Sequence, residues 1–275
     1  MSNRRVLIVG YGVVGKAMAD LFKNKEVWVY DVSLLARRRA KKDGYKTISN
    51  LKRSDECGLA IVCVPTPMYP DGSANISIVY SVVVELESSL ILIKSTVPPG
   101  TTDPLANFYD KSVAFSPEYI GESRYHTNYR YPHPTNARSH EFFNIGGEQD
   151  VCSAIWEYFK DEMCVDTRVN FSTAIEAELA KYMENAFFAT KVMFCNEMYD
   201  ICEMNGACYE VVRNMWLSDN RINPMHTAVF ADKRGFGGKC FPKDVSAIIA
   251  DTRDKGGEPT LLEAVRDKNE QYGED

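Results

Sequence analysis

The chain has 275 residues, of which 45% are hydrophobic and 25% charged, and its formal net charge is −6. This composition is typical of a folded globular protein and excludes disordered, collagen-like and low-complexity architectures. No apolar run approaches the roughly 18 residues of a membrane span, and the N-terminal apolar stretch is too brief for a secretory signal. The acidic balance argues against nucleic acid as a partner. We therefore expect a cytoplasmic protein without membrane association.

The eight cysteines include neither a CxxC pair nor a Cys/His cluster at zinc spacing, so the sequence predicts no metal site. Without a secretion signal, reduced thiols are expected. Seven of the eight are interpreted as small buried hydrophobes. The eighth, Cys240, stands in a motif of its own.

Short apolar runs alternate with helical segments over residues 1–168. The runs are Val6–Val9, Val27–Tyr30, Leu59–Val64, Leu90–Ile93, Val113–Phe115 and Phe142–Ile145. Their continuous apolar character indicates strands that are covered on both faces. Helices such as Lys16–Lys23 and Ile78–Glu87 fit between them, so the pattern predicts an α/β fold with a doubly wound parallel sheet.

Within this region, Gly10-Tyr11-Gly12-Val13-Val14-Gly15 follows the first strand and opens a helix, and Asp31 ends the next strand. This is the dinucleotide-binding fingerprint in its required context. Gly10 permits the tight turn, Gly12 lets the backbone approach a pyrophosphate, and Gly15 allows close helix packing. The helix start at Val13 and Val14 offers unpaired N–H groups to the phosphates. Because Asp31 would accept from the ribose hydroxyls and repel a 2′-phosphate, we predict NAD as the cofactor.

The pattern changes near residue 170. Residues 173–204 contain neither Gly nor Pro, with Ser172 or Thr173 available as the N-cap, Glu176 placed for a capping box and Gly206 just beyond the end. This predicts one long helix that is apolar around much of its surface and is buried between layers or subunits. We therefore expect a Rossmann-like NAD-binding domain over 1–168, a helical central domain over 169–275, and a homodimer.

The segment 235–244 places three glycines directly before Cys240, which lies between Lys239 and Lys243. Neighbouring ammonium groups favour the thiolate. A nucleophilic thiol in a nicotinamide-dependent enzyme points to aldehyde oxidation through a covalent thioester. The same pattern alone fits a structural cysteine equally well. Lys239 and Lys243 fit phosphate binding, thiolate stabilisation or simple solvation.

Five ordered motifs carry a resemblance to a known family. They are VCVPTP (62–67), KSTVPPGTT (94–102), SPEYIGE (116–122), AELAKYMENAFFATKVMFCNE (177–197) and GFGGKCFPKD (235–244). Together they resemble the UDP-glucose/GDP-mannose dehydrogenase family over nearly the whole chain. The resemblance implies a four-electron oxidation of the C6 alcohol of a nucleotide sugar, with UDP-glucose as the expected substrate and two NAD⁺ consumed.

The resemblance also implies roles for individual residues. Cys240 would hold the aldehyde as a thiohemiacetal and then a thioester, and Asp244 would move protons through an ordered water near Thr96. Lys181 and Asn185 are four residues apart on the long helix and would stabilise oxyanions. Glu118 would activate water for thioester hydrolysis. Taken one at a time, these residues also fit ordinary capping or solvent-facing positions.

Further contacts follow from the same motifs. The expected cofactor contacts are completed by Val64, Pro65, Thr66, Thr96 and Glu122. The expected substrate contacts are Glu118, Tyr119, Ile120, Lys181, Asn185, Phe236, Gly237 and Lys243.

The sequence departs from the family in two places. Members usually continue into a second α/β domain that binds the nucleotide, so either this is a minimal form, that domain is missing, or a partner chain supplies it. The segment 121–147 is rich in Tyr, His and Pro. Its Arg124, Arg130, Arg138, His126, His133 and His140 form either a replacement anion site or part of a surface loop.

Two alternative functions stay open at this point. One is a two-electron hydroxyacid dehydrogenase, a class that also joins a Rossmann domain to a long-helix domain and does not need Cys240. The other is a catalytically silent NAD-binding or assembly module. The number of NADH formed per sugar separates the first from the four-electron reaction.

Overall fold

The computed structural model describes residues 5–120 and 136–273. The chain divides into two compact units, each described here by itself. Unit 1 comprises Met1–Pro67 and Asn75–Lys181, and unit 2 comprises Met68–Ala74 and Tyr182–Asp275.

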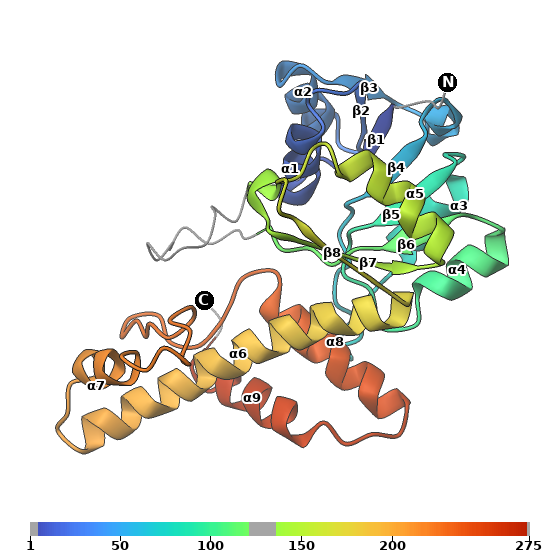
Figure 1. Ribbon diagram of the computed structural model, residues 1–275. Coiled ribbons are helices and arrows are strands. Elements are labelled where there is room, and N and C mark those ends of the chain that lie inside the picture. The colour runs from blue at the N-terminus through green and yellow to red at the C-terminus, as the bar shows by residue number, and fades with distance from the viewer. Residues whose placement is uncertain (1–4, 121–135, 274–275) are drawn as a thin grey trace. The chain divides into compact units, whose positions relative to one another are not determined.

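Unit 1 is built on an eight-stranded sheet with the strand order β3-β2-β1-β4-β5-β6-β7-β8 (Figure 1). The strands are β1 (Val6–Val9), β2 (Val27–Tyr30), β3 (Lys46–Ile48), β4 (Leu59–Val62), β5 (Leu90–Ile93), β6 (Val113–Phe115), β7 (Phe142–Gly147) and β8 (Arg168–Ser172). All neighbouring pairs are parallel except β6 and β7. The predicted α/β architecture with a doubly wound, mostly parallel sheet is confirmed.

Helices cover both faces of this sheet. They are α1 (Val13–Leu21), α2 (Leu34–Lys42), α3 (Ser77–Glu85), α4 (Thr102–Tyr109) and α5 (Gln149–Phe159), with short 3-10 turns η1 (Leu51–Glu56) and η2 (Ala137–Ser139). Val6 and Ile8 of β1 pack with residues of α1, α2 and α5, whereas Leu7 and Val9 pack with residues of α3 and α4. Because successive strand residues face opposite sides, strands covered on both faces read as continuous apolar runs.

Unit 2 is helical. It contains most of α6 (Ala174–Met204), then α7 (Tyr209–Trp216), α8 (Phe241–Asp254) and α9 (Thr260–Glu270), and it includes the short hairpin 68–74 from the middle of the chain. Met193 of α6 packs with Val245 of α8 and Val265 of α9 in one cluster. Cys195 and Cys202 of α6 pack with Tyr209 of α7 in another.

The long helix α6 begins with the predicted capping box. The Thr173 N–H donates to Glu176 Oε2 over 2.8 Å, and the Glu176 N–H donates to Thr173 Oγ1 over 3.4 Å. Beyond its end, Gly206 adopts a φ of +66°, a conformation that glycine reaches without steric cost. The 31-residue helix predicted from the absence of Gly and Pro is therefore confirmed.

All eight cysteines are free thiols, as the sequence predicts. The expectation that seven of them are buried is wrong for Cys164 and Cys208, which are exposed like Cys240, and Cys63 is only partly buried. Cys164 and Cys208 lie in the segments that follow α5 and α6. In the part of the chain that the structure describes, no helix is long and apolar enough to cross a membrane.

Candidate active site

The glycine loop of unit 1 connects β1 to α1. A Cβ on Gly10 would lie 2.5 Å from the carbonyl oxygen of Cys63, and one on Gly15 would lie 1.8 Å from that of Gly10. A Cβ on Gly12 would meet nothing within 4 Å. Gly10 and Gly15 are thus required by the packing of the loop itself, whereas Gly12 keeps an open approach to the backbone.

Helix α1 starts at Val13 directly after this open position, with Gly12 as its N-cap and no side chain accepting from its first N–H groups. Helix N-termini of this kind attract phosphate through unpaired N–H groups and the helix dipole. The open space above Gly12 and the uncapped start of α1 therefore fit the pyrophosphate of a dinucleotide.

Asp31 lies at the end of β2, beside the glycine loop. Its two carboxylate oxygens accept from the Tyr11 N–H and the Ser33 N–H, each over 2.7 Å. Each oxygen keeps a further lone pair, because a carboxylate offers about four acceptor sites. The two backbone contacts hold Asp31 in one orientation and leave it able to accept from ribose hydroxyls.

The carboxyl ends of β4 and β5 carry the next predicted cofactor residues. Val64, Pro65 and Thr66 follow β4, and the Ser95 hydroxyl donates to the Val64 carbonyl over 2.7 Å. Thr96 is half-buried in the loop after β5. Ligands of open α/β sheets bind at this edge, outside the carboxyl ends of the strands.

The far end of the same loop is fixed by Glu178 of α6, which is fully buried. Its Oε2 accepts from the Gly100 N–H over 2.6 Å, and its Oε1 accepts from the N–H and hydroxyl of Thr102 over 2.9 and 2.6 Å. Burial raises the pKa of Glu178, and these hydrogen bonds oppose that rise. Glu178 lies in one of the sequence motifs. Its contacts with the loop after β5 could not be predicted from the sequence, because only the fold brings the two segments together.

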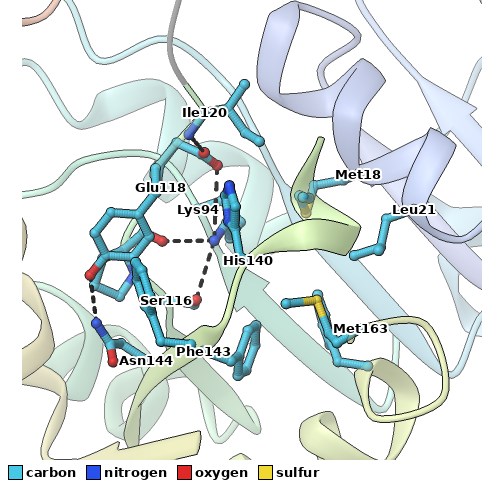
Figure 2. A pocket seen from close by; sticks show the side chains of 15 residues that line it. Met18, Leu21, Lys94, Ser116, Glu118, Ile120, His140, Phe143, Asn144 and Met163 are labelled. Atoms are coloured by element: carbon cyan, nitrogen blue, oxygen red, sulfur yellow. Dashed lines mark hydrogen bonds and ion pairs between the residues drawn. The ribbon is translucent and has the colours of Figure 1, made fainter. Parts of the chain in front are cut away.

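Glu118, Tyr119 and Ile120 follow β6 at the same edge. Figure 2 shows the side chains of Glu118 and Ile120. Glu118 is 9% exposed, and its Oε1 accepts from the Ile120 N–H. The Tyr119 hydroxyl accepts from Asn144 Nδ2 over 2.6 Å, and its ring lies 5.4 Å from the Lys181 ammonium. The structure therefore brings together Tyr119 and Lys181, two predicted substrate contacts far apart in sequence.

Of the segment 121–147, Glu122, Arg124, His126, Arg130 and His133 lie outside the described residues. Arg138 Nη2 donates to the Leu21 carbonyl over 2.7 Å and to Glu162 Oε2 over 3.1 Å. His140 stacks on Phe142, and burial lowers its pKa. Arg138 and His140 are the two residues of this set that the structure describes, and both contact other parts of the protein. Neither supports the predicted replacement anion site.

Unit 2 presents Cys240 as the exposed N-cap residue of α8. The N-terminal dipole of a helix favours a thiolate at such a position. The Asp244 N–H donates to the Cys240 carbonyl over 2.8 Å, which places the Asp244 side chain one turn into the helix. The predicted nucleophile thus lies at a structurally defined helix end.

Asp244 itself is 2% exposed. Its Oδ2 accepts from Asn185 Nδ2 over 2.6 Å, and its Oδ1 pairs with Lys243. Asn185 is also buried, and it comes from α6, 59 residues earlier in the chain. Three residues that the motifs singled out separately are therefore in direct contact within unit 2.

The loop before Cys240 is held by residues that sequence reasoning missed. The Phe236 N–H donates to Asn269 Oδ1 over 2.7 Å, and Asn269 Nδ2 donates back to the Phe236 carbonyl over 2.9 Å. Arg234 Nε donates to Asn196 Oδ1 over 2.7 Å, and Nη2 donates to Asp200 Oδ1 over 2.7 Å. Asn196 lies in the motif 177–197, which gave it no role, and no motif marks Asp200 or Asn269. All three contact partners more than 30 residues away.

These features define a class: a protein with a Rossmann-type dinucleotide-binding sheet and a helical unit that carries an exposed cysteine. Within the described residues, no group of three His, Cys, Asp or Glu side chains is placed to hold a metal ion.

Comparisons with known proteins define the family. Residues 20–135 match the NAD binding domain of the UDP-glucose/GDP-mannose dehydrogenase family, and residues 175–271 match its central domain. The chain belongs to the UDP-glucose/GDP-mannose dehydrogenase family, and its cofactor is NAD.

Individual relatives agree with this assignment. A UDP-glucose 6-dehydrogenase from Pseudomonas aeruginosa is 28% identical over 96% of this chain and 65% of its own length. One from Rickettsia bellii is 31% identical over 76% of this chain and 48% of its own length. The structure of a UDP-glucose dehydrogenase from Pyrobaculum islandicum superposes with a TM-score of 0.83 at 25% identity, covering 97% of this chain and 68% of that chain. The chain thus spans between about half and two thirds of the length of these curated relatives.

Proposed function

We propose that this chain carries out the NAD-dependent four-electron oxidation of the C6 alcohol of a nucleotide sugar, with UDP-glucose converted to UDP-glucuronate. The contact of Asn185 with Asp244, one helical turn after the exposed Cys240, carries the proposal. A buried, hydrogen-bonded carboxylate next to an exposed thiol serves no evident packing purpose. It suits a nucleophile with a proton-transfer partner beside it.

The residues of unit 2 account for the covalent part of the reaction. The Cys240 sulfur attacks the aldehyde carbon of the half-oxidised sugar, and the carbonyl oxygen takes up a proton to give a thiohemiacetal. Asp244 moves this proton, in an orientation fixed by Asn185 and Lys243. NAD⁺ at the glycine loop supplies the hydride acceptor for both oxidations.

The residues of unit 1 account for oxyanion stabilisation and hydrolysis. The Lys181 ammonium, 8% exposed, is a cation available for the substrate oxygen as charge develops on it. Thr96 holds a water for proton transfer. Glu118 accepts a proton from water as the water oxygen attacks the thioester carbon. The C–S bond then breaks, and the departing Cys240 sulfur takes that proton from Glu118 to become the thiol.

The test is a measurement of NADH formation with UDP-glucose, UDP-N-acetylated sugars and GDP-mannose, with product quantified alongside. Two NADH per sugar support the four-electron reaction. One NADH per substrate, unaffected by Cys240→Ser, would instead support the two-electron hydroxyacid-type alternative. Tight NAD binding without turnover of any sugar would support the silent NAD-binding module.

Cys240→Ser is the matched variant for the thioester, because serine preserves the size and helix position of the residue. We expect it to reduce the steady-state rate at least about 100-fold while NAD binding stays unchanged. Cys208→Ser serves as the control, since Cys208 is another exposed cysteine in the same unit, also at a helix N-cap. Equal rates for the two variants would contradict a nucleophilic Cys240.

We also propose that the active form is a homodimer. On the unit 2 part of α6, Met183, Phe187, Phe194, Ile201 and Met204 are exposed. Their spacing of four, seven, seven and three residues places them on one side of a helix. Such a stripe is the expected seam for a second copy of the same helix.

A further inference from the structure

A buried lysine, Lys94, lies beside Glu118 and has no role in the reaction as proposed above. It directly follows β5 and is 7% exposed. Its ammonium donates to the Pro117 carbonyl over 2.8 Å and to Ser116 Oγ over 3.2 Å. Lysine is rarely buried to this degree unless its charge is compensated.

The compensating charge is the carboxylate of Glu118. Lys94 Nζ lies 3.9 Å from Glu118 Oε2, beyond ordinary hydrogen-bond distance but within ion-pair range. Glu118 Oε1 is engaged with the Ile120 N–H, whereas Oε2 is buried and has no hydrogen-bond partner among the described residues. A buried carboxylate oxygen without a donor is costly. The attraction of the adjacent Lys94 ammonium explains the orientation of the Glu118 carboxylate.

Both groups line a cavity of about 20 Å³, shown in Figure 2. That volume accommodates about one water molecule. The opposite wall is apolar and includes Met18 and Met163. Glu118 thus lines a space that fits one water molecule, the molecule that its proposed role requires.

Other titratable groups face Lys94 and Glu118 from the elements that pack around them. His140, which precedes β7, lines the same cavity, and burial lowers its pKa. Cys63 follows β4, and burial keeps its thiol protonated by raising its pKa. Lys181 of α6 contributes repulsion toward Lys94, and Tyr119 bonds through its hydroxyl to Asn144. Among these described groups, Lys94 is the cation in ion-pair range of Glu118.

We propose that Lys94 is a positioning residue that holds the Glu118 carboxylate in its orientation beside this one-water cavity. The inference deepens the proposed function, since it rests on Glu118 as the base of thioester hydrolysis. Lys94 touches neither the sugar nor the thioester in this scheme. It acts through the charge and direction of the Glu118 carboxylate.

The first experiment needs no substrate. The Glu118 carboxyl ¹³C chemical shift is compared at one neutral pH in the wild type and in Lys94→Met, and is assigned by its loss in Glu118→Gln. Because this chemical shift depends on the neighbouring charge and on the hydrogen bonds of the carboxylate, Lys94→Met should change it. Lys25→Met is the matched control, because Lys25 forms another ion pair in unit 1, with Glu162 at 3.3 Å, and it should leave the Glu118 signal in place. An unchanged Glu118 signal in Lys94→Met would overturn the proposal.

The second experiment measures hydrolysis. In single-turnover reactions, Lys94→Met should form NADH at the wild-type rate but release the uronic acid about 100-fold more slowly. Lys94→Gln, which keeps a hydrogen-bond donor but lacks the charge, should show the same effect if Lys94→Met does not fold. A changed Glu118 signal with normal hydrolysis in these variants would overturn the positioning role. A Glu118 signal that responds to Lys94→Met as expected, in a protein whose wild type forms no NADH, would refute the proposed function and leave the coupling of Lys94 and Glu118 in place.

Discussion

Gly12 and Gly15 lie three residues apart in the glycine loop, yet a methyl group on each would have different consequences. At Gly15 it would overlap the Gly10 carbonyl oxygen at 1.8 Å, which only a backbone shift can relieve. At Gly12 it would meet open space, the space that a pyrophosphate would occupy. One position is thus a requirement of folding and the other a requirement of ligand approach.

We expect Gly15→Ala to lower the free energy of unfolding by more than about 2 kcal/mol. We expect Gly12→Ala to unfold like the wild type but to bind NAD at least about tenfold more weakly. Urea unfolding and calorimetric NAD titration of both variants test this pair. Equal stability losses in the two variants would contradict the division of roles.

His226 is a residue whose protonation opposes folding of unit 2. Its ring stacks on Phe188 and packs at a tilt of 57° against Phe241. Its Nδ1 has no hydrogen-bond partner among the described residues, and Lys191 contributes repulsion. Burial, followed by the charge of Lys191, lowers its pKa from 6.5 to about 4. The unfolded chain therefore binds this proton at higher pH than the folded chain does.

The stability contributed by a neutral His226 is present above pH 6.5 and is lost as the pH falls toward about 4. The slope for one group is at most about 1.4 kcal/mol per pH unit. His226→Asn removes the titration and tolerates the left-handed φ of 62° at this position. The difference in unfolding free energy between wild type and variant should shrink between pH 7.5 and pH 5, and a constant difference would refute the assignment.

At the scale of elements, the exposed stripe on α6 extends over 22 residues, from Met183 to Met204, or about 32 Å of helix. Met183 and Met204 are 76% and 77% exposed, and Phe187 is 60% exposed. Association of two such stripes would remove a large apolar surface from water, at about 25 cal/mol per Å² buried. The free energy of this burial is the reason to expect a stable dimer.

Phe187→Glu combined with Phe194→Glu should convert the protein to a monomer by sedimentation equilibrium, because a carboxylate in the seam loses its hydration. Glu203→Lys is the control, since it changes the charge of an exposed α6 residue outside the stripe. A monomeric wild type, or a double variant that remains dimeric, would refute the α6 seam.

Much of unit 1 could be predicted because parallel strands covered on both faces read as apolar runs. The expected β1, β2, β5 and β6 agree with the structure to the residue. Helix limits are less well predicted: α1 begins at Val13 rather than at Lys16, because the helix starts inside the glycine motif itself. The limits of α6 follow from its capping box and its terminal glycine, both of which are local signals.

Features that depend on long-range contacts could not be predicted. The edge strand β8 includes Arg168, Asn170 and Ser172, so its composition resembles that of a loop, and it is a strand because β7 pairs with it. The antiparallel direction in which β6 and β7 pair is likewise marked by no local pattern in either strand. Within the candidate site, the same limit applies to Lys94. The motif shows a lysine, and only the fold shows that it is buried next to Glu118.

At the scale of the whole molecule, the NAD-binding unit and the cysteine-bearing unit are connected by α6, since the boundary between them falls between Lys181 and Tyr182. We expect NAD to bind at the glycine loop of unit 1 and Asp31 to favour it over NADP. This carboxylate is fixed by the Tyr11 and Ser33 N–H groups, so it cannot turn away from a 2′-phosphate without losing both hydrogen bonds.

A ligand that binds only the folded chain stabilises it by about 2.7 kcal/mol at a concentration 100 times its Kd. For a protein of this size, that stabilisation corresponds to a rise of about 5–10 °C in the unfolding midpoint. We expect NAD to produce this rise in a thermal shift assay, and NADP at the same concentration to produce less than about 2 °C, because the 2′-phosphate meets the Asp31 charge. Asp31→Asn removes the charge with little change in shape, so it should bring the NAD and NADP shifts closer together. Equal shifts for the two cofactors in the wild type would contradict the role of Asp31 in excluding the 2′-phosphate.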